Sequence, residues 1–156
     1  MKVKSLRIIR AKPNPAGKDR YGRYTPPAQL NGEWVDIQND GDQAYPMDNI
    51  ALHNLVFKPG CKDPEWREYM TFQGALGVGK VVRVHAGHKP AALPPIDEYG
   101  ADVHLYTGRD YVLNNDCGDV IGLWDRVGRF WEDKASYDPN PQEGVILRRE
   151  GDKLVP

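Results

Sequence analysis

Basic and aromatic side chains interleave near the start of the chain, an arrangement that can bind an anion. Lys12, Lys18, Arg20 and Arg23 belong to a run of eight Lys and Arg residues within residues 1–23, against Asp19 alone. Two tyrosines lie among these cations. Cations neutralise phosphates, and aromatic rings stack on bases. The four cations are therefore predicted to contact nucleic acid or the acidic face of another protein.

An acidic segment follows directly. Residues 24–57 contain no Lys or Arg and carry five acids, Glu33, Asp36, Asp40, Asp42 and Asp48. The two segments are expected to face each other within the fold or to be solvated. A head-to-tail contact between subunits is the alternative, and it predicts a salt-dependent homo-oligomer. The net charge of −1 favours no class of partner.

Oxygen-bearing side chains gather in Asn-Asn-Asp-Cys-Gly-Asp at 114–119. Asp116 and Asp119 are the weak candidates for a metal, since Ca²⁺ prefers oxygen ligands, but their spacing is not that of an EF-hand. A turn is expected instead. His85 and His88 end a predicted strand, where side chains three apart point to opposite faces. We therefore expect no metal site and no cofactor.

A glycine-rich stretch from Gly74 to Lys80 matches G-x-x-x-x-G-K, the start of a phosphate-binding loop. The motif needs Ser or Thr next and a helix after it, but Val81 follows and begins a predicted strand. The stretch is expected to be a turn. Ser5 and Ser136 lie in no nucleophile elbow. The chain is predicted not to be an enzyme, with a metal-dependent hydrolase as the weakest alternative.

The two cysteines, Cys61 and Cys117, are too few for a disulfide framework or a cysteine zinc cluster. Two free thiols are predicted, with a single bridge as the alternative. No apolar run is long enough for a transmembrane helix, and no signal peptide is evident. A cytoplasmic location is expected, or a secreted one if a signal peptide has been removed.

The elements that would position these residues are short strands. In Glu33 to Asn39, Val35 and Ile37 share one face, and Asp36 shares the other with Trp34. Residues 61–68 are predicted to be a polar connection and residues 87–102 a loop. The other predicted strands are Val3 to Ala11, Ile50 to Phe57, Tyr69 to Phe72, Val81 to Ala86, Tyr111 to Leu113, Val120 to Asp125, Phe130 to Ala135 and Gly144 to Arg149. About eight short antiparallel strands predict an all-β sandwich.

An ordered series of motifs along these strands resembles the lamin-tail domain (LTD), an immunoglobulin-like sandwich. The match covers residues 5–135. The motifs that carry it are Asn14-Pro15-x-Gly17-x-Asp19, Glu33-Trp34-Val35-Asp36-Ile37-x-Asn39-x-Gly41, Gly79 to His85, Asn114-Asn115-Asp116-x-Gly118-Asp119 and Leu123-Trp124-Asp125-x-x-Gly128. Relative to that family, Ile50 replaces a tryptophan, and the loops at 58–68 and 87–106 are enlarged.

The resemblance implies a fold and a non-catalytic role in binding, tethering or scaffolding, with a protein partner. Lamins place this domain after a coiled-coil rod, but this chain has no heptad array. Residues 1–135 are expected to form the sandwich, and residues 136–156 a C-terminal extension that packs on it or trails from it. Within the sandwich, Asn39 and Asn115 are expected to cap turns, and Trp34 and Trp124 to anchor the core.

Overall fold

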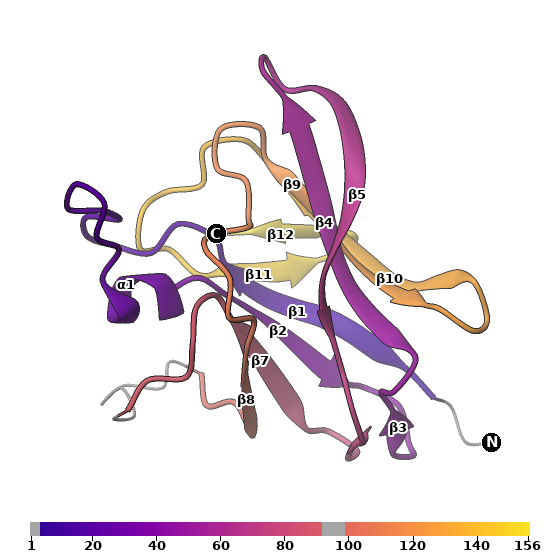
Figure 1. Ribbon diagram of the computed structural model, residues 1–156. Coiled ribbons are helices and arrows are strands. Elements are labelled where there is room, and N and C mark those ends of the chain that lie inside the picture. The colour runs from indigo at the N-terminus through magenta and orange to yellow at the C-terminus, as the bar shows by residue number, and fades with distance from the viewer. Residues whose placement is uncertain (1–3, 92–98) are drawn as a thin grey trace.

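The computed structural model describes residues 4–91 and 99–156, and in this part the chain is almost entirely β-structure (Figure 1). Its elements are β1 (Leu6–Lys12), α1 (Pro27–Asn31), β2 (Trp34–Asn39), β3 (Tyr45–Pro46), β4 (Ile50–Lys58), β5 (Lys62–Thr71), β6 (Ala75–Leu76), β7 (Val81–His85), β8 (Val103–Tyr106), β9 (Asp119–Asp125), β10 (Phe130–Tyr137), β11 (Leu147–Glu150) and β12 (Lys153–Val155). The predicted all-β class is confirmed.

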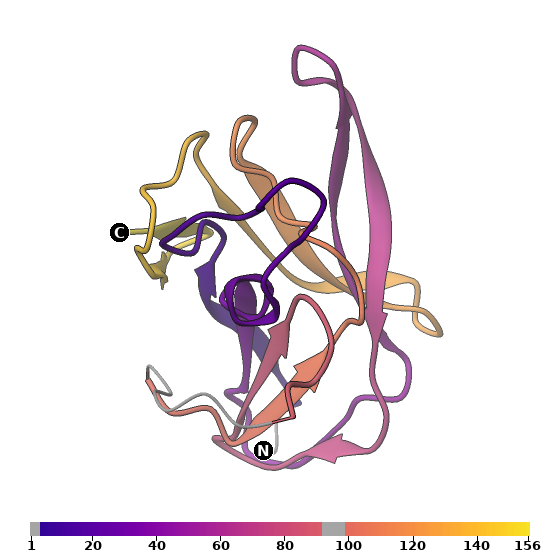
Figure 2. The same ribbon diagram turned by 60° about the vertical axis from the view of Figure 1, so that its left-hand side comes forward.

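Ten of these strands form one sheet in the order β5-β4-β9-β10-β12-β11-β1-β2-β7-β8, and β3 pairs with β6. The sheet is strongly curled (Figure 2). Strands from both halves therefore turn side chains into a single core. Its most deeply buried members include Ile8, Ile37, Leu52, Ile121 and Leu123. This is the sandwich arrangement, made from one folded-over sheet.

Alternating side chains explain why β2 and β7 lie where they do. Val35 and Ile37 of β2 enter the core, as do Val82 and Val84 of β7. The two strands pair antiparallel, with Val35 opposite Val84 and Ile37 opposite Val82. The period-2 pattern that predicts these strands therefore also predicts which face is buried.

The strand count and pairing differ from the prediction of about eight antiparallel strands. The described residues contain twelve strands, and the β7–β8 and β10–β12 pairs are parallel. Residues 62–71, predicted to begin as a polar connection, form edge strand β5. Tyr111 to Leu113 is not a strand. Val3, at the start of the predicted first strand, and residues 92–98 of the predicted loop lie outside the described residues.

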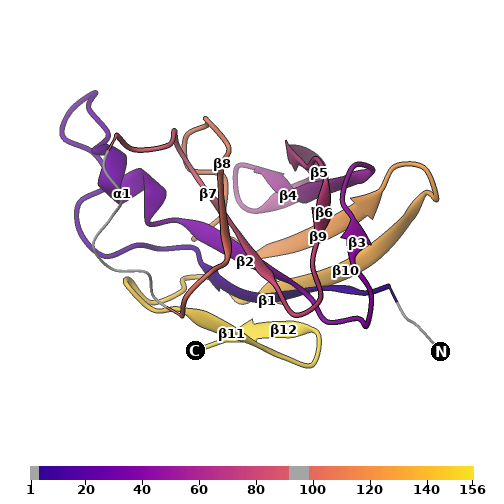
Figure 3. The ribbon, with the colours of Figure 1, turned by 90° about the horizontal axis from the view of Figure 1, so that it is seen from below.

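The C-terminal segment supplies two strands inside the large sheet. β11 pairs with β1, and β12 pairs with both β11 and β10, so the two strands lie beside β1 (Figure 3). Leu147 and Leu154 enter the core. The Asp133 carboxylate accepts hydrogen bonds from the amide of Ile8 at 2.7 Å and from the guanidinium of Arg149 at 2.7 Å. This carboxylate ties β1, β10 and β11 together.

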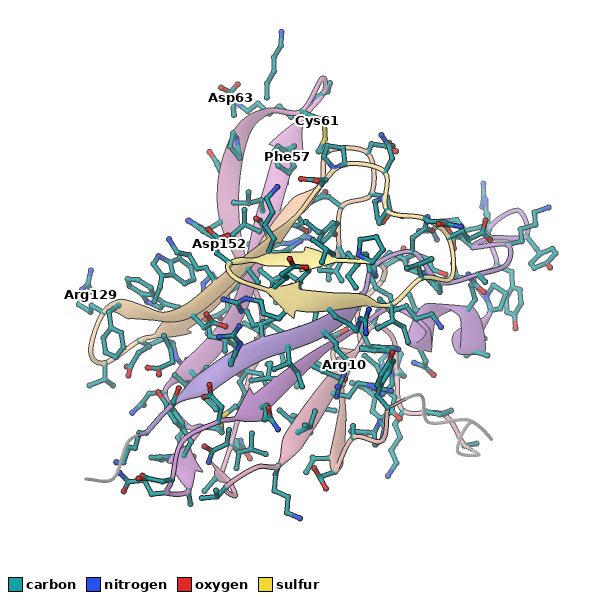
Figure 4. All side chains as sticks on the ribbon, turned by 180° about the vertical axis from the view of Figure 1, so that it is seen from behind. Arg10, Phe57, Cys61, Asp63, Arg129 and Asp152 are labelled. Carbon is teal, nitrogen blue, oxygen red and sulfur yellow. A yellow bond between two sulfur atoms is a disulfide. The ribbon has the colours of Figure 1, made fainter. Side chains whose placement is uncertain are left out.

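The two cysteines form a disulfide, so the prediction of free thiols is wrong and the alternative of one bridge holds. Cys61 lies at the tip of the projecting β4–β5 hairpin (Figure 4), and Cys117 lies in the turn before β9. Their Cα atoms are 5.5 Å apart, within the usual range for a bridge. The bridge fastens the hairpin to the body of the sandwich.

Within residues 4–91 and 99–156, no helix has the length and apolar character needed to span a bilayer.

Candidate functional site

Aromatic side chains collect on the outer face of strands β5, β4, β9 and β10. Along β4, Ile50 and Leu52 enter the core, so the alternation turns Ala51 and His53 outward. On β9, Ile121 and Leu123 enter the core in the same way. Trp124 and Gly122 are therefore on the outer face.

Strand register aligns the outward residues in rows across the sheet. His53 lies opposite Glu68 of β5 on one side and opposite Gly122 of β9 on the other. Gly122 in turn lies opposite Lys134 of β10, and Trp124 lies opposite Trp131. Residues directly opposite in an antiparallel pair share a face. One row of outward residues therefore runs from Glu68 through His53 and Gly122 to Lys134.

The glycine in this row makes room for an indole. A Cβ atom at Gly122 would lie 2.6 Å from Cζ3 of Trp131, so any larger residue would collide with the ring. The indole of Trp131 thus occupies the place in the row that Gly122 leaves empty. Trp66 on β5, opposite Leu55 of β4, reaches the same ring from the other side.

Four rings form a connected cluster, which we call the tryptophan face: His53, Trp66, Trp124 and Trp131. The centroid of Trp131 lies 4.3 Å from that of Trp66, 4.8 Å from that of Trp124 and 5.4 Å from that of His53. Trp66 is 41% exposed, and the other three are half-buried. Three of the chain's four tryptophans thus lie on a solvent-facing surface.

Charged groups of both signs border the tryptophan face. The ammonium of Lys134 lies over the Trp131 ring at 5.9 Å from its centroid. Glu68 and Lys134 are both exposed. Aromatic residues are enriched at the centres of binding surfaces, and polar residues at their rims. The arrangement can stack a flat ligand and hydrogen-bond its edges.

Asp119, a weak metal candidate in the sequence, holds the base of the β4–β5 hairpin instead. Its carboxylate accepts hydrogen bonds from the side-chain amides of Asn54 at 2.9 Å and Asn114 at 3.0 Å. The backbone amides of Leu55 and Val120 donate to it as well, at 2.9 and 2.8 Å. Burial raises the pKa of Asp119, and these donors oppose the rise. The Asp119 oxygens are therefore already bonded to groups of the fold.

Asp116, the other candidate, is exposed in the turn that precedes β9. No group of three or more potential metal ligands occurs among residues 4–91 and 99–156.

The two asparagines expected to cap turns behave differently. The side chain of Asn39 donates to the carbonyls of Gln43 and Leu76, and its Oδ1 accepts from the amide of Gly41. Oδ1 of Asn115 is buried and has no hydrogen-bond partner among the described residues. Asn114 fills that structural role, because its side chain bonds Leu55 and Asp119.

Trp34 is buried, but it packs on a charged group. The guanidinium of Arg83 lies 3.7 Å from the centroid of its ring. Arg83 also donates to both carboxylate oxygens of Asp36, at 2.7 and 2.9 Å, and Arg10 donates to the same carboxylate at 2.9 Å. Asp36 is fully buried. The positive and negative segments therefore meet within the fold, at least through Arg10 and Asp36.

Trp124 does not reach the core where the sequence predicts it, because the register of β9 turns it outward onto the tryptophan face.

His85 lies beside this ion-pair cluster. One of its ring nitrogens is 2.7 Å from the carbonyl oxygen of Asn31, and the other is 2.8 Å from Nδ1 of His104. Its ring stacks on that of Tyr106 at 4.7 Å. Burial lowers the pKa of His85 to about 4, although the contact with Asn31 opposes the shift. His88, which the sequence pairs with His85, is exposed.

Glu33 is a buried carboxylate that fastens a loop. Its oxygens accept hydrogen bonds from the amides of Val112 and Leu113, both at 3.1 Å. Burial raises the pKa of Glu33 to about 8, and the two amides oppose the shift. Tyr69 and Tyr137, deeply buried on other strands, have pKa values raised by the same loss of solvent. The Glu33 side chain is therefore part of the scaffold.

The predicted anion-binding cations lie mostly on the loop between β1 and α1, which projects from one end of the sheet (Figure 1). Arg20 is paired with Asp110 at 2.7 Å, and the ammonium of Lys18 lies 4.9 Å from the centroid of Tyr21. Lys12 lies apart from them, at the end of β1. Lys18, Arg20 and Arg23 are exposed.

Sequence reasoning missed the tryptophan face because its residues are far apart in the chain. A weak signal existed in the β9–β10 hairpin, where Gly122, Trp124 and Trp131 alternate around a short turn. Nothing local links Trp66 to them, since strand pairing through β4 brings it near.

No protein-family model matches this chain, and no curated protein matches its sequence.

Proposed function

We propose that this chain is a non-catalytic binding or tethering module whose contact surface is the tryptophan face. The observation that carries the proposal is the clustering of three partly exposed indoles on one solvent-facing sheet surface. Aromatic residues are enriched at interaction surfaces relative to the rest of a protein's surface. Tryptophan is also the residue most enriched among energetically dominant contacts.

Several contacts favour a binding role over an enzymatic one. The cysteine thiols are consumed in the disulfide. The buried carboxylates of Glu33, Asp36 and Asp119 are each held by two or more donors from the fold. Active sites usually expose titratable groups with shifted pKa values in a cleft, whereas these groups are inside the scaffold.

We also propose a lamin-tail-like identity for the sandwich. The order of the sequence motifs and the all-β fold support it, and a binding role agrees with what that resemblance implies. For location, the disulfide favours the secreted alternative over the cytoplasm, because structural disulfides persist in oxidising compartments.

The anion-binding alternative is weaker. The guanidinium of Arg20 is already engaged by Asp110, and Lys12 lies on a different element from the other three cations. Exposed Tyr21 and Tyr24 on the same loop are the features that favour it.

The direct test is a binding screen with three proteins: the wild type, Trp66→Ala and Tyr24→Ala. Each is labelled and applied to an array that carries peptides, oligosaccharides and single-stranded nucleic acids. Trp66 lies on the edge strand β5 and is the most exposed of the four rings at 41%, and Tyr24, at 60% exposed, is an exposed aromatic outside the tryptophan face. We expect the wild-type signals to disappear with Trp66→Ala and to persist with Tyr24→Ala.

Signals that survive in Trp66→Ala but disappear in Tyr24→Ala would contradict the proposal and move the contact surface to the N-terminal loop. Circular dichroism and thermal unfolding of each variant show whether a lost signal reflects a lost fold.

A further inference from the structure

If the tryptophan face is the contact surface, as the proposed function holds, its chemistry indicates which class of ligand it binds. Its apolar part consists of the faces and edges of three indoles and one imidazole. Indole faces carry negative charge density and attract weakly positive C–H groups. The ring faces of a pyranose present such C–H groups in a plane. The surface therefore fits a flat, saturated ring as well as an aromatic one.

The polar rim supplies hydrogen-bonding groups of complementary kinds. Glu68 is only an acceptor when ionised, Lys134 is only a donor, and His53 can be either. All three lie in one row across the strands, with the Trp131 ring between His53 and Lys134. A ligand edge that both donates and accepts, as a row of hydroxyl groups does, matches this rim.

The charge balance argues against a polyanion. The charged residues in the same row as the rings are an acid, Glu68, and a base, Lys134, so this row carries no excess of positive charge to attract phosphates. Nucleic-acid surfaces neutralise several phosphates with clustered cations. Of the cations that the sequence offers for that purpose, Lys18, Arg20 and Arg23 lie on the β1–α1 loop and Lys12 lies at the end of β1, none of them on β5, β4, β9 or β10.

The size of the apolar patch argues against a protein partner. Three partly exposed indoles offer on the order of 200 Å² of apolar surface, since a whole indole side chain buries about 150–250 Å². A standard protein interface buries about 800 Å² on each partner, of which somewhat more than half is apolar, roughly twice the area of this patch. The smaller size of this patch favours a small ligand over a protein surface. The disulfide is a separate observation in favour, because it suits the oxidising surroundings in which extracellular polysaccharides occur.

We infer that the tryptophan face binds a neutral oligosaccharide, with Trp66 stacking on a sugar ring, Trp131 supporting Trp66 from behind, and Glu68 and Lys134 bonding the hydroxyl groups of the sugar. Trp66 is the most exposed of the rings, so it supplies the main stacking surface. Trp131 is the centre of the cluster, in contact with each of the other three rings.

The test is native affinity electrophoresis of the full chain in gels containing hydroxyethyl cellulose, xylan, soluble β-1,3-glucan or galactomannan. Heparin and oligo(dT) serve as polyanion probes. We expect at least one neutral polysaccharide to retard the wild type. Trp66→Ala should weaken that binding about tenfold, because each stacked ring contributes roughly a factor of ten at most. Trp66→Phe, which restores a ring, should recover most of it.

Variants at the polar rim test the proposed hydrogen bonds, and a variant outside the tryptophan face is the control. Glu68→Gln and Lys134→Met should each weaken binding by about threefold to tenfold, the loss expected for one hydrogen bond. Tyr24→Ala should match the wild type. Calorimetry with matching hexasaccharides then gives dissociation constants for the variants.

Two outcomes overturn the inference in different ways. If no neutral polysaccharide retards the wild type, while peptides or oligo(dT) bind and need Trp66, the ligand class is wrong and the proposed function stands. If a polysaccharide binds equally well to the wild type, Trp66→Ala and Glu68→Gln, both the ligand site and the proposed contact surface are wrong.

Discussion

The indole of Trp131 lies over Gly122, where a Cβ would come within 2.6 Å of the ring. Gly122 is itself buried in strand β9 beneath that ring. The absence of a side chain at this position leaves room on the outer face for the indole, which there meets Trp66 and His53.

Gly122→Ala should therefore displace Trp131 and lower the free energy of unfolding by about 1–3 kcal/mol, the usual cost of overpacking. Urea unfolding measures this loss. A double-mutant cycle with Trp131→Ala identifies its cause, because removing the ring removes the collision. If Gly122→Ala costs the same with and without the ring, the contact does not explain the glycine.

The Cys61–Cys117 disulfide should stabilise the fold substantially. It closes a loop with a sequence separation of 56, for which chain entropy gives roughly 4 kcal/mol, and measured values are typically about 2–4 kcal/mol. The double variant Cys61→Ser/Cys117→Ser should lose that amount in urea unfolding. Dithiothreitol should destabilise the wild type and leave the double variant unchanged. Equal sensitivity of both proteins to the reductant would contradict the bridge.

Glu33 should make the protein less stable as the pH rises. Its folded pKa is about 8, raised by burial above the ordinary 4.5, so between these values the folded state keeps a proton that the unfolded state has lost. This contribution to stability is full below pH 4.5 and is lost as the pH rises through 8. The slope approaches about 1.4 kcal/mol per pH unit within that window.

Glu33→Gln should remove this contribution, because glutamine does not titrate. The effect should be clearest between pH 6.5 and 8, since His85 opposes Glu33 below that range. The substitution should also lower stability at low pH, since the amide group presents only one oxygen to the two backbone donors at Val112 and Leu113. Chemical unfolding at several pH values from 4.5 to 8 checks both effects. An unchanged slope in the variant would show that Glu33 is ionised in the folded state.

His85 should make the protein less stable as the pH falls. Its folded pKa is about 4, lowered by burial from 6.5, so the unfolded state gains a proton first as the pH falls. This contribution is present above pH 6.5 and is lost as the pH falls through 4. His85→Gln should remove this contribution, so that the opposing effect of Glu33 is left uncompensated between pH 4.5 and 6.5, while His88→Gln, an exposed control, should keep the wild-type profile. Equal acid sensitivity in the wild type and His85→Gln would rule out His85 as its source.

The sequence predicts the fold best where one face of a strand is buried. Val35 and Ile37 alternate with polar neighbours, and their strand, its buried face and its terminal turn at Asn39 all follow from that pattern. The first part of strand β5 was missed because Lys62 to Glu68 lies along the sheet edge, where burial does not select apolar residues, whereas the predicted strand from Tyr69 overlaps its end.

The features that the sequence did not predict depend on contacts between segments that are far apart in the chain. The parallel pairing of β12 with β10 and the bridge from Cys61 to Cys117 depend on how distant hairpins meet, which no local pattern records. The tryptophan face has the same origin, because Trp66 reaches Trp131 only across two intervening strands. The candidate site could therefore not be assembled from spacing in the sequence.

The most direct measurement is a ¹H–¹⁵N spectrum of the four indole N–H groups during titration with the bound oligosaccharide. Three of these groups belong to the tryptophan face, and Trp34, buried against Arg83, is an internal control. We expect the signals of Trp66, Trp124 and Trp131 to shift with one dissociation constant while that of Trp34 stays in place. Saturable binding that leaves the first three signals unmoved would contradict the account.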